Sequence, residues 1–258
     1  MTQDAPGRIE SLNGVDIYFE LHGSGEPLLL LHGFSGSSQD WAGVTAEWSD
    51  QFQLIVPDLR GHGRSSILST SFRHQDAAVD MLALLDRLGI GACSGLGISG
   101  GGNVLLHMAT RQPERIRAMV LVSATPYFPA QARAIMRQYS DSLPEAQWEA
   151  LRRRHPGGDA QIRALLASTK AFAESYDDMS FTPPHLATIR ARTLIVQGDR
   201  DPLYPVELSV EMAKAIPEAS LWVVPKGGHG PVIGERWPEF LKTAAAFLAR
   251  PQNSIAPN

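Results

Sequence analysis

The stretch GLGISGGG contains two overlapping glycine motifs that imply different chemistries. Gly95, Gly97 and Gly100 form G-x-G-x-x-G, which is typical of loops that bind the pyrophosphate of a dinucleotide. Gly97, Ser99 and Gly101 form G-x-S-x-G, the sharp strand-to-helix turn that exposes a nucleophilic serine. Each motif requires partner residues elsewhere in the chain, and those partners decide between the two interpretations.

The dinucleotide interpretation lacks its acidic partner. Such a site needs an Asp or Glu at the end of the next strand, about 20 residues further on, to hold a ribose. The next apolar run, AMVLVSA, ends in Ser123 and Ala124 instead. The glycine turn also follows several strands, whereas a dinucleotide loop follows the first strand of its βαβ unit. The sequence therefore disfavours a nucleotide site.

The nucleophile interpretation finds a base and an acid at later strand ends. A serine hydroxyl needs a histidine base, which a carboxylate in turn orients. Asp201 follows the run TLIVQG, and His229 follows the run LWVV, in the order that hydrolases with this turn use. Asp199 shares the acidic loop, but its place directly after a glycine is typical of turn chemistry. Asp201 lies deeper in the loop, before Pro202, so we favour it as the partner of His229.

The elements that must position these residues alternate along the chain. RIESL and VDIYFEL flank Asn13-Gly14, a strong signal for a β-hairpin. Continuous apolar runs predict strands buried on both faces of a parallel sheet: PLLLLHG, QLIVPD, ACSGLGI, AMVLVSA, TLIVQGD and LWVVPKGGH. Four segments between and after them show helical spacing: FRHQDAAVDMLALLDRLG, GGNVLLHMATRQP, PVELSVEMAKAIP and PEFLKTAAAFLAR. This alternation predicts an open α/β sheet.

One region interrupts the alternation of strands and helices. Between residues 125 and 189 the segments PAQARAIMRQY, PEAQWEALRRRH, DAQIRALLASTKAFAESY and PPHLATI predict three or four short helices. The insertion leaves from the carboxyl end of a strand, where open α/β sheets bind ligands. We therefore expect a helical cap over residues 125–189 and a core domain formed by residues 1–124 and 190–258. The alternative is an extra helical layer without a functional role.

Five short motifs, in a fixed order, carry a family resemblance over almost the whole chain. They are LLHGFSGSSQDW, VPDLRGHGRS, GISGGG, QGDRDPLYP and GGHG, and together they resemble an α/β-hydrolase. The resemblance implies an α/β fold with a mostly parallel, eight-stranded, doubly wound sheet. It also implies a nucleophile elbow after the fifth strand and a lid between the sixth and seventh strands.

The same resemblance assigns roles to individual residues. It implies that Ser99 is the nucleophile, Asp201 the acid and His229 the base. It further implies an oxyanion hole formed by the backbone N–H groups of Phe34 and Gly100. Gly100 departs from the bulkier residue often found at its position, which leaves more room beside the nucleophile.

The implied reaction is acyl transfer from a small-molecule ester to water, without a cofactor. Candidate pocket residues, each equally compatible with a core role, are Ile98, Tyr127, Phe128, Met136, Leu203 and Tyr204. Their apolar character predicts small to medium hydrophobic esters. The same triad also serves lactonases, C–C bond hydrolases, perhydrolases and hydrolase-like receptors that turn over slowly, and these remain alternatives. The run Arg152–Arg154 is expected to form a solvated face of the cap.

The remaining polar residues favour structural roles. The residues of DLRGHGRS are expected to brace neighbouring loops, and His32 is expected to shape the oxyanion loop. His107 is expected to pack, and His74, His155 and His185 are expected at the surface or in the cap. Because no histidine pair has metal-ligand spacing with a nearby acid, we predict no metal.

Composition and charge limit the classes of protein and the kinds of partner that fit this sequence. The 258 residues carry a net charge of −4, which gives no indication of a nucleic-acid partner. No apolar run is long enough to span a bilayer, and MTQDAPGRIE lacks the features of a signal peptide, so we expect no membrane partner and a cytoplasmic protein. The lone cysteine, Cys93, is expected to be a buried thiol. Residues 1–7 and 251–258 are expected to fray. The oligomeric state stays open.

Overall fold

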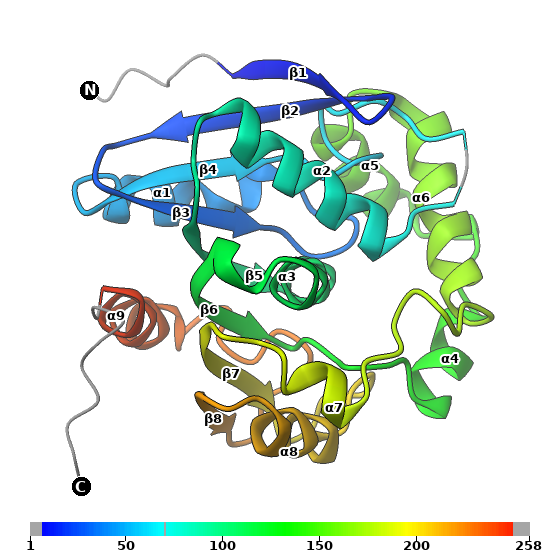
Figure 1. Ribbon diagram of the computed structural model, residues 1–258. Coiled ribbons are helices and arrows are strands. Elements are labelled where there is room, and N and C mark those ends of the chain that lie inside the picture. Colours follow the sequence, from blue (N-terminus) through cyan, green and yellow to red (C-terminus); the bar gives the residue numbers. More distant parts are fainter. Residues whose placement is uncertain (1–6, 70, 250–258) are drawn as a thin grey trace, which may run out of the picture.

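The computed structural model describes residues 7–69 and 71–249 and contains the expected eight-stranded sheet (Figure 1). The strands, in the order β1-β2-β4-β3-β5-β6-β7-β8, span the following residues: β1 Arg8–Leu12, β2 Val15–His22, β3 Glu26–Leu31, β4 Phe52–Pro57, β5 Cys93–Ile98, β6 Ile116–Val122, β7 Arg192–Gly198 and β8 Ala219–Val224. Neighbours from β4 to β8 pair in parallel, whereas β2 is antiparallel to both β1 and β4. The predicted frayed ends lie outside the described residues, apart from Gly7.

The N-terminal hairpin forms where the Asn-Gly pair predicts it. Asn13 has φ 50° and Gly14 has φ 80°, the left-handed values that a two-residue hairpin loop requires. The pairing register places Leu12 opposite Val15 across this turn. The hairpin prediction is therefore confirmed.

Side chains of β3 alternate between two separate halves of the core. Leu29 and Leu31 pack in the half formed with α2 (His74–Arg87), α3 (Gly100–Arg111) and α8 (Val206–Ala215). Leu28 and Leu30 pack in the other half, with α1 (Ala42–Trp48) and α9 (Trp237–Leu248). Figure 1 shows α1 and α9 on the sheet face opposite α2 and α8. Helices on both faces explain why the strands read as continuous apolar runs.

Helix α1 is the main element that the sequence pattern did not predict. It spans only seven residues and directly follows a 3₁₀ turn at Ser38–Trp41. So short a segment shows little helical periodicity, and it is stabilised instead by burying Val44 and Trp48 against the sheet.

The segment between β6 and β7 contains helices α4 to α7, which span Ala130–Met136, Glu145–Arg154, Gly158–Phe172 and Pro183–Leu186. Figure 1 shows α4 and α6 beside the edge of the sheet to which the parallel strands point. Trp148 of α5 packs on Ile162 and Leu166 of α6 in a small core of its own. Among the described residues, no helix combines the length and apolarity needed to span a membrane.

Candidate active site

Ser99 lies at the tight turn between β5 and α3. Its backbone has φ 51° and ψ −116°, a left-handed conformation that is uncommon for a residue with a side chain. The turn requires small neighbours, because a Cβ on Gly97 would lie 2.5 Å from the backbone of Gly101. The Ser99 N–H donates to the carbonyl of Val122 at 2.7 Å, which ties the turn to β6. The glycines on both sides of Ser99 are therefore needed for the chain to turn sharply at this residue.

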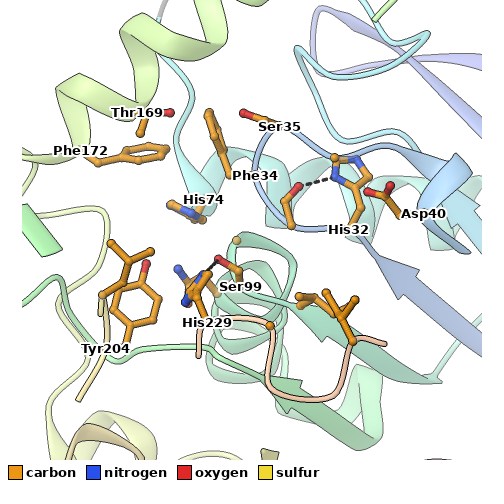
Figure 2. A pocket seen from close by; sticks show the side chains of 18 of the residues that line it. His32, Phe34, Ser35, Asp40, His74, Ser99, Thr169, Phe172, Tyr204 and His229 are labelled. Carbon is orange, nitrogen blue, oxygen red and sulfur yellow. Dashed lines mark hydrogen bonds between the residues drawn. The ribbon is translucent and has the colours of Figure 1, made fainter. Parts of the chain in front are cut away.

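Three strand ends bring a serine, a histidine and an aspartate into one hydrogen-bonded chain. Nε2 of His229, in the loop after β8, lies 2.8 Å from Oγ of Ser99 (Figure 2). Nδ1 of the same ring lies 2.8 Å from Oδ2 of Asp201, in the loop after β7. Asp199, the alternative acid, is exposed. The structure thus brings together Ser99, His229 and Asp201, the three residues that the sequence motifs indicate.

Asp201 is held by several donors besides His229. Its Oδ1 accepts the backbone N–H groups of Leu203 at 2.8 Å and Tyr204 at 3.1 Å. Its Oδ2 accepts a hydrogen bond from Nε2 of Gln197 at 2.9 Å. Burial by itself raises the pKa of the Asp201 carboxyl, but His229 and the backbone donors outweigh it and hold that pKa below its ordinary value. The carboxylate is therefore ionised at neutral pH and fixed in place.

Phe34 and Gly100, whose backbone N–H groups are the candidate oxyanion hole, approach each other beside Ser99. A Cβ placed on Gly100 would lie 3.2 Å from the Phe34 nitrogen, so the two residues approach closely beside Ser99. His32 shapes this loop: its Nδ1 donates to the Gly33 carbonyl at 2.8 Å, and its Nε2 accepts the Leu59 N–H at 3.0 Å. Burial lowers the pKa of His32, and this hydrogen-bond pattern fits the neutral ring.

The turn DLRGHGRS braces its neighbours. Asp58 accepts the backbone N–H of Ser38 at 2.5 Å and that of Arg64 at 2.7 Å. Arg60 contacts Asp80 of α2 at 2.8 Å, and neither residue lines the cavity beside Ser99. These contacts agree with a structural role for this turn.

A cavity of about 860 Å³ adjoins Ser99. Five of the six predicted pocket residues line it, namely Ile98, Phe128, Met136, Leu203 and Tyr204. Tyr127 is not among the lining residues; its side chain is exposed, and its hydroxyl donates to Glu211 at 3.3 Å. Phe172, at the end of α6, also lines the cavity, and no local sequence pattern indicates this position.

His74 departs from its expected position, whereas His155 lies in the expected cap segment but is buried there. His74 is buried and lines the cavity, with its Nδ1 2.7 Å from Oδ2 of Asp178. His155 is fully buried; its Nδ1 accepts the Gly63 N–H at 3.0 Å, and its Nε2 donates to the Ser35 carbonyl at 3.1 Å. The expectation for His74 was wrong because its partner, Asp178, is remote in sequence. His185 is exposed, as expected.

The arginine run of the cap is only partly a solvated face. Arg152 forms exposed pairs with Glu145 and Asp159. Arg154 instead lines the cavity and pairs with Asp40 at 2.6 Å. The expectation of a wholly solvated run was therefore wrong for Arg154, whose partner comes from the 3₁₀ turn of the core.

Sequence reasoning missed Gln197 as a partner of Asp201. A signal was present, since Gln197 is the one amide in the apolar run TLIVQGD, and a buried polar side chain requires a partner. For His74 the sequence held no comparable signal, because its partner Asp178 lies 104 residues away. In the described parts of the chain, no group of three His, Cys, Asp or Glu side chains is arranged to hold a metal ion.

Comparison with known proteins places this architecture in a family. The chain matches the Alpha/beta hydrolase family over residues 28–243, which is most of its length. The protein belongs to the alpha/beta hydrolase family. The family resemblance drawn from the five motifs is thereby confirmed, and so is the fold.

Individual members of the family differ in reaction. This alpha/beta hydrolase is 28% identical over 252 residues to a pimeloyl-[acyl-carrier protein] methyl ester esterase of Nitrosomonas europaea, with 84% of this chain and 94% of that protein covered. It is 29% identical over 256 residues to a putative carbamate hydrolase, RutD, of Pseudomonas savastanoi pv. phaseolicola, with 88% and 95% covered. A thermophilic esterase from Thermogutta terrifontis superposes with a TM-score of 0.75 at 25% identity, covering 94% of this chain and 97% of that one. The protein is thus similar to hydrolases of more than one bond type.

Proposed function

We propose that the protein hydrolyses carboxylic esters of small to medium hydrophobic substrates through an acyl-enzyme. The observation that carries the proposal is the chain of two 2.8 Å contacts from Ser99 through His229 to Asp201, at the wall of an apolar cavity. This is the geometry of nucleophile, base and orienting acid that acyl transfer requires. The similarity to two esterases supports the ester as substrate.

In the proposed mechanism, Ser99 Oγ attacks the ester carbonyl while its proton passes to Nε2 of His229. The N–H groups of Phe34 and Gly100 stabilise the oxyanion, an effect worth about 10²–10³ in rate per donor in related chemistry. Asp201 keeps the proton on Nδ1 of His229 and stabilises the imidazolium. His229 then protonates the leaving alcohol, and later activates a water that releases the acid.

Hydrolysis of p-nitrophenyl butyrate tests this proposal. We expect the wild-type protein to release p-nitrophenolate and Ser99→Ala to lose at least about 10³ in kcat, because among the described residues no other hydroxyl is paired with His229. A fluorophosphonate should label the wild type at Ser99. Equal turnover by the two proteins, or an adduct on another residue, would overturn the assignment.

A panel of an ester, a lactone, a carbamate and a vinylogous diketone separates ester hydrolysis from the alternatives of the same fold. We expect the highest kcat/KM for the ester. If the lactone, the carbamate or the diketone has a higher kcat/KM than the ester, then that compound represents the preferred substrate class. The assignment of Ser99 as nucleophile would be unaffected. Tight binding of a hydrophobic ligand with no turnover of any member would instead indicate a receptor.

A further inference from the structure

A second histidine–aspartate pair lies in the cavity, apart from the chain of Ser99. His74 is the first residue of α2, and Asp178 lies between α6 and α7. Their side chains are 2% and 1% exposed, and Nδ1 of the ring lies 2.7 Å from the carboxylate. The same carboxylate accepts the backbone N–H groups of His74 at 2.9 Å and Gln75 at 3.1 Å. Asp178 thus caps α2 and fixes the orientation of the ring at once.

The second ring nitrogen of His74, Nε2, is available to a ligand in the cavity. Burial alone would raise the pKa of Asp178, but its hydrogen bonds and the charge of His74 lower that pKa to about 2. The carboxylate is therefore ionised, and Nδ1 must carry the proton that it accepts. Nε2 has no hydrogen-bond partner among the residues that the structure describes.

The surroundings of His74 are largely apolar. Its ring centre lies 5.0 Å from that of Phe172, 5.2 Å from that of Phe72 and 5.8 Å from that of Phe128. Figure 2 shows the ring between Phe172 and Ser99. A polar nitrogen among aromatic rings is costly unless a partner reaches it, so the pocket is built to receive a polar atom at this point.

Nε2 of His74 lies close to Gly100, one of the two residues of the proposed oxyanion hole. A Cβ on Gly100 would lie 3.7 Å from Nε2 and 3.2 Å from the nitrogen of Phe34. A longer side chain at Gly100 would occupy the space between the proposed oxyanion hole and His74. The glycine leaves that space open to a substrate.

A purely structural role would not account for His74. The cap of α2 uses the backbone N–H groups of His74 and Gln75, which a leucine at position 74 would also supply. An apolar side chain at position 74 could also pack against the surrounding aromatic rings, so what the imidazole adds is the bond to Asp178 and a nitrogen turned to the cavity. His155 shows the contrast, since both of its ring nitrogens bind backbone groups of neighbouring loops.

We propose that Nε2 of His74 hydrogen-bonds a hydroxyl on the carbon next to the scissile carbonyl, so that the preferred substrates are esters of hydrophobic 2-hydroxy acids. The inference rests on the proposed ester hydrolysis. A hydroxyl both donates and accepts, so it satisfies Nε2 whether that nitrogen carries a proton or a lone pair. The aromatic walls receive the apolar part of the acyl group.

Two esters that differ only in this hydroxyl test the proposal: methyl 3-phenylpropanoate and methyl 2-hydroxy-3-phenylpropanoate. We expect a roughly tenfold higher kcat/KM for the hydroxy ester with the wild type, the effect of one hydrogen bond. In His74→Leu the ratio should fall to near one, and His74→Gln should retain part of it. His185→Leu, an exposed cap histidine, is the matched control and should keep the wild-type ratio.

Binding measurements separate this inference from the proposed function. In the Ser99→Ala background, calorimetry should show tighter binding of the hydroxy ester, and adding His74→Leu should remove the difference. Equal binding of both esters with His74 in place, or an unchanged difference without it, would overturn the inference even if esters are cleaved. Lack of ester cleavage by the wild type would instead contradict the proposed function.

Discussion

At the scale of single residues, the site depends on backbone geometry that small residues permit. Ser99 holds a left-handed φ of 51°, and Gly97 lies where a Cβ would meet the backbone of Gly101 at 2.5 Å. The orientation of the Asp201 carboxylate is specified in the same local way. This carboxylate accepts the N–H groups of Leu203 and Tyr204, two and three residues further along the chain, a local arrangement that aspartate favours in turns.

Separate substitutions of Asp199 and Asp201 test which of the two aspartates is the partner of His229. Asp201→Asn should lower kcat by about 10³–10⁴, because an amide no longer favours the productive tautomer of the histidine. Asp199→Asn should stay within about twofold of the wild type, since Asp199 is exposed. The measurement is steady-state hydrolysis of p-nitrophenyl butyrate, and the reverse ranking would assign Asp199 as the acid.

At the scale of elements, a buried arginine holds the cap helices together. Arg133 of α4 is 6% exposed, and its guanidinium donates to the carbonyls of Phe128, Phe172, Ala173 and Ser175. Three of these carbonyls lie at or just after the end of α6, where a cation also interacts favourably with the helix dipole. The guanidinium thereby links α4 to the end of α6 above the cavity.

Truncation of this side chain should loosen the cap. Arg133→Ala leaves buried carbonyls without a donor, so we expect a loss of about 2–4 kcal/mol in the free energy of unfolding. Arg137→Ala is the matched control: Arg137 is half exposed and pairs with Glu174, so the loss should be below about 1 kcal/mol. Urea unfolding gives both values, and faster proteolysis within residues 130–180 should accompany the first. Equal midpoints for the two variants would refute the role of Arg133.

At the scale of the whole molecule, buried neutral histidines join the cap to the core. His155 follows α5 and binds the loops of Gly63 and Ser35, and burial lowers its pKa to about 4. His107 of α3 contacts the Asp178 carbonyl at 2.7 Å, and burial lowers its pKa to about 4 as well. Both rings lie between the sheet domain and the cap segment, so their protonation bears on how the two parts associate.

The stability of the protein should therefore fall on acidification. The folded pKa of each histidine is below its ordinary value of 6.5, so the unfolded chain binds more protons between pH 6.5 and about 4. The stabilisation is fully present above pH 6.5 and is lost as the pH falls toward 4, by about 1.4 kcal/mol per pH unit for each ring. Urea midpoints from pH 8 to pH 4 measure this slope.

A substitution separates the histidine contribution from that of the carboxylates. His155→Gln removes one titrating ring, so its stability should vary less steeply between pH 6.5 and 4 than that of the wild type. The exposed His185→Gln should leave the slope unchanged. A wild-type midpoint that is the same at pH 7 and pH 4.5 would contradict the linkage.

The sequence by itself determined the features that depend on neighbours in the chain. Continuous apolar runs marked the parallel strands, Asn13-Gly14 marked the hairpin, and the small residues around Ser99 marked the sharp turn. Because the carboxyl ends of parallel strands meet at one edge of a sheet, the sequence also indicates Asp201 and His229 as partners of Ser99. These inferences succeed because each rests on local steric rules or on one rule of topology.

Only the tertiary structure shows the features that depend on contacts between residues far apart in the sequence. In the folded protein the exposed Tyr127 contacts Glu211, and His155 is buried between two loops. His74 contacts Asp178, which lies 104 residues away in the sequence. Helix α1, in turn, is too short for a periodic signal and is stabilised by packing. The physical reason is the same in each case: hydrogen-bond partners and buried surface come from segments that no local pattern connects.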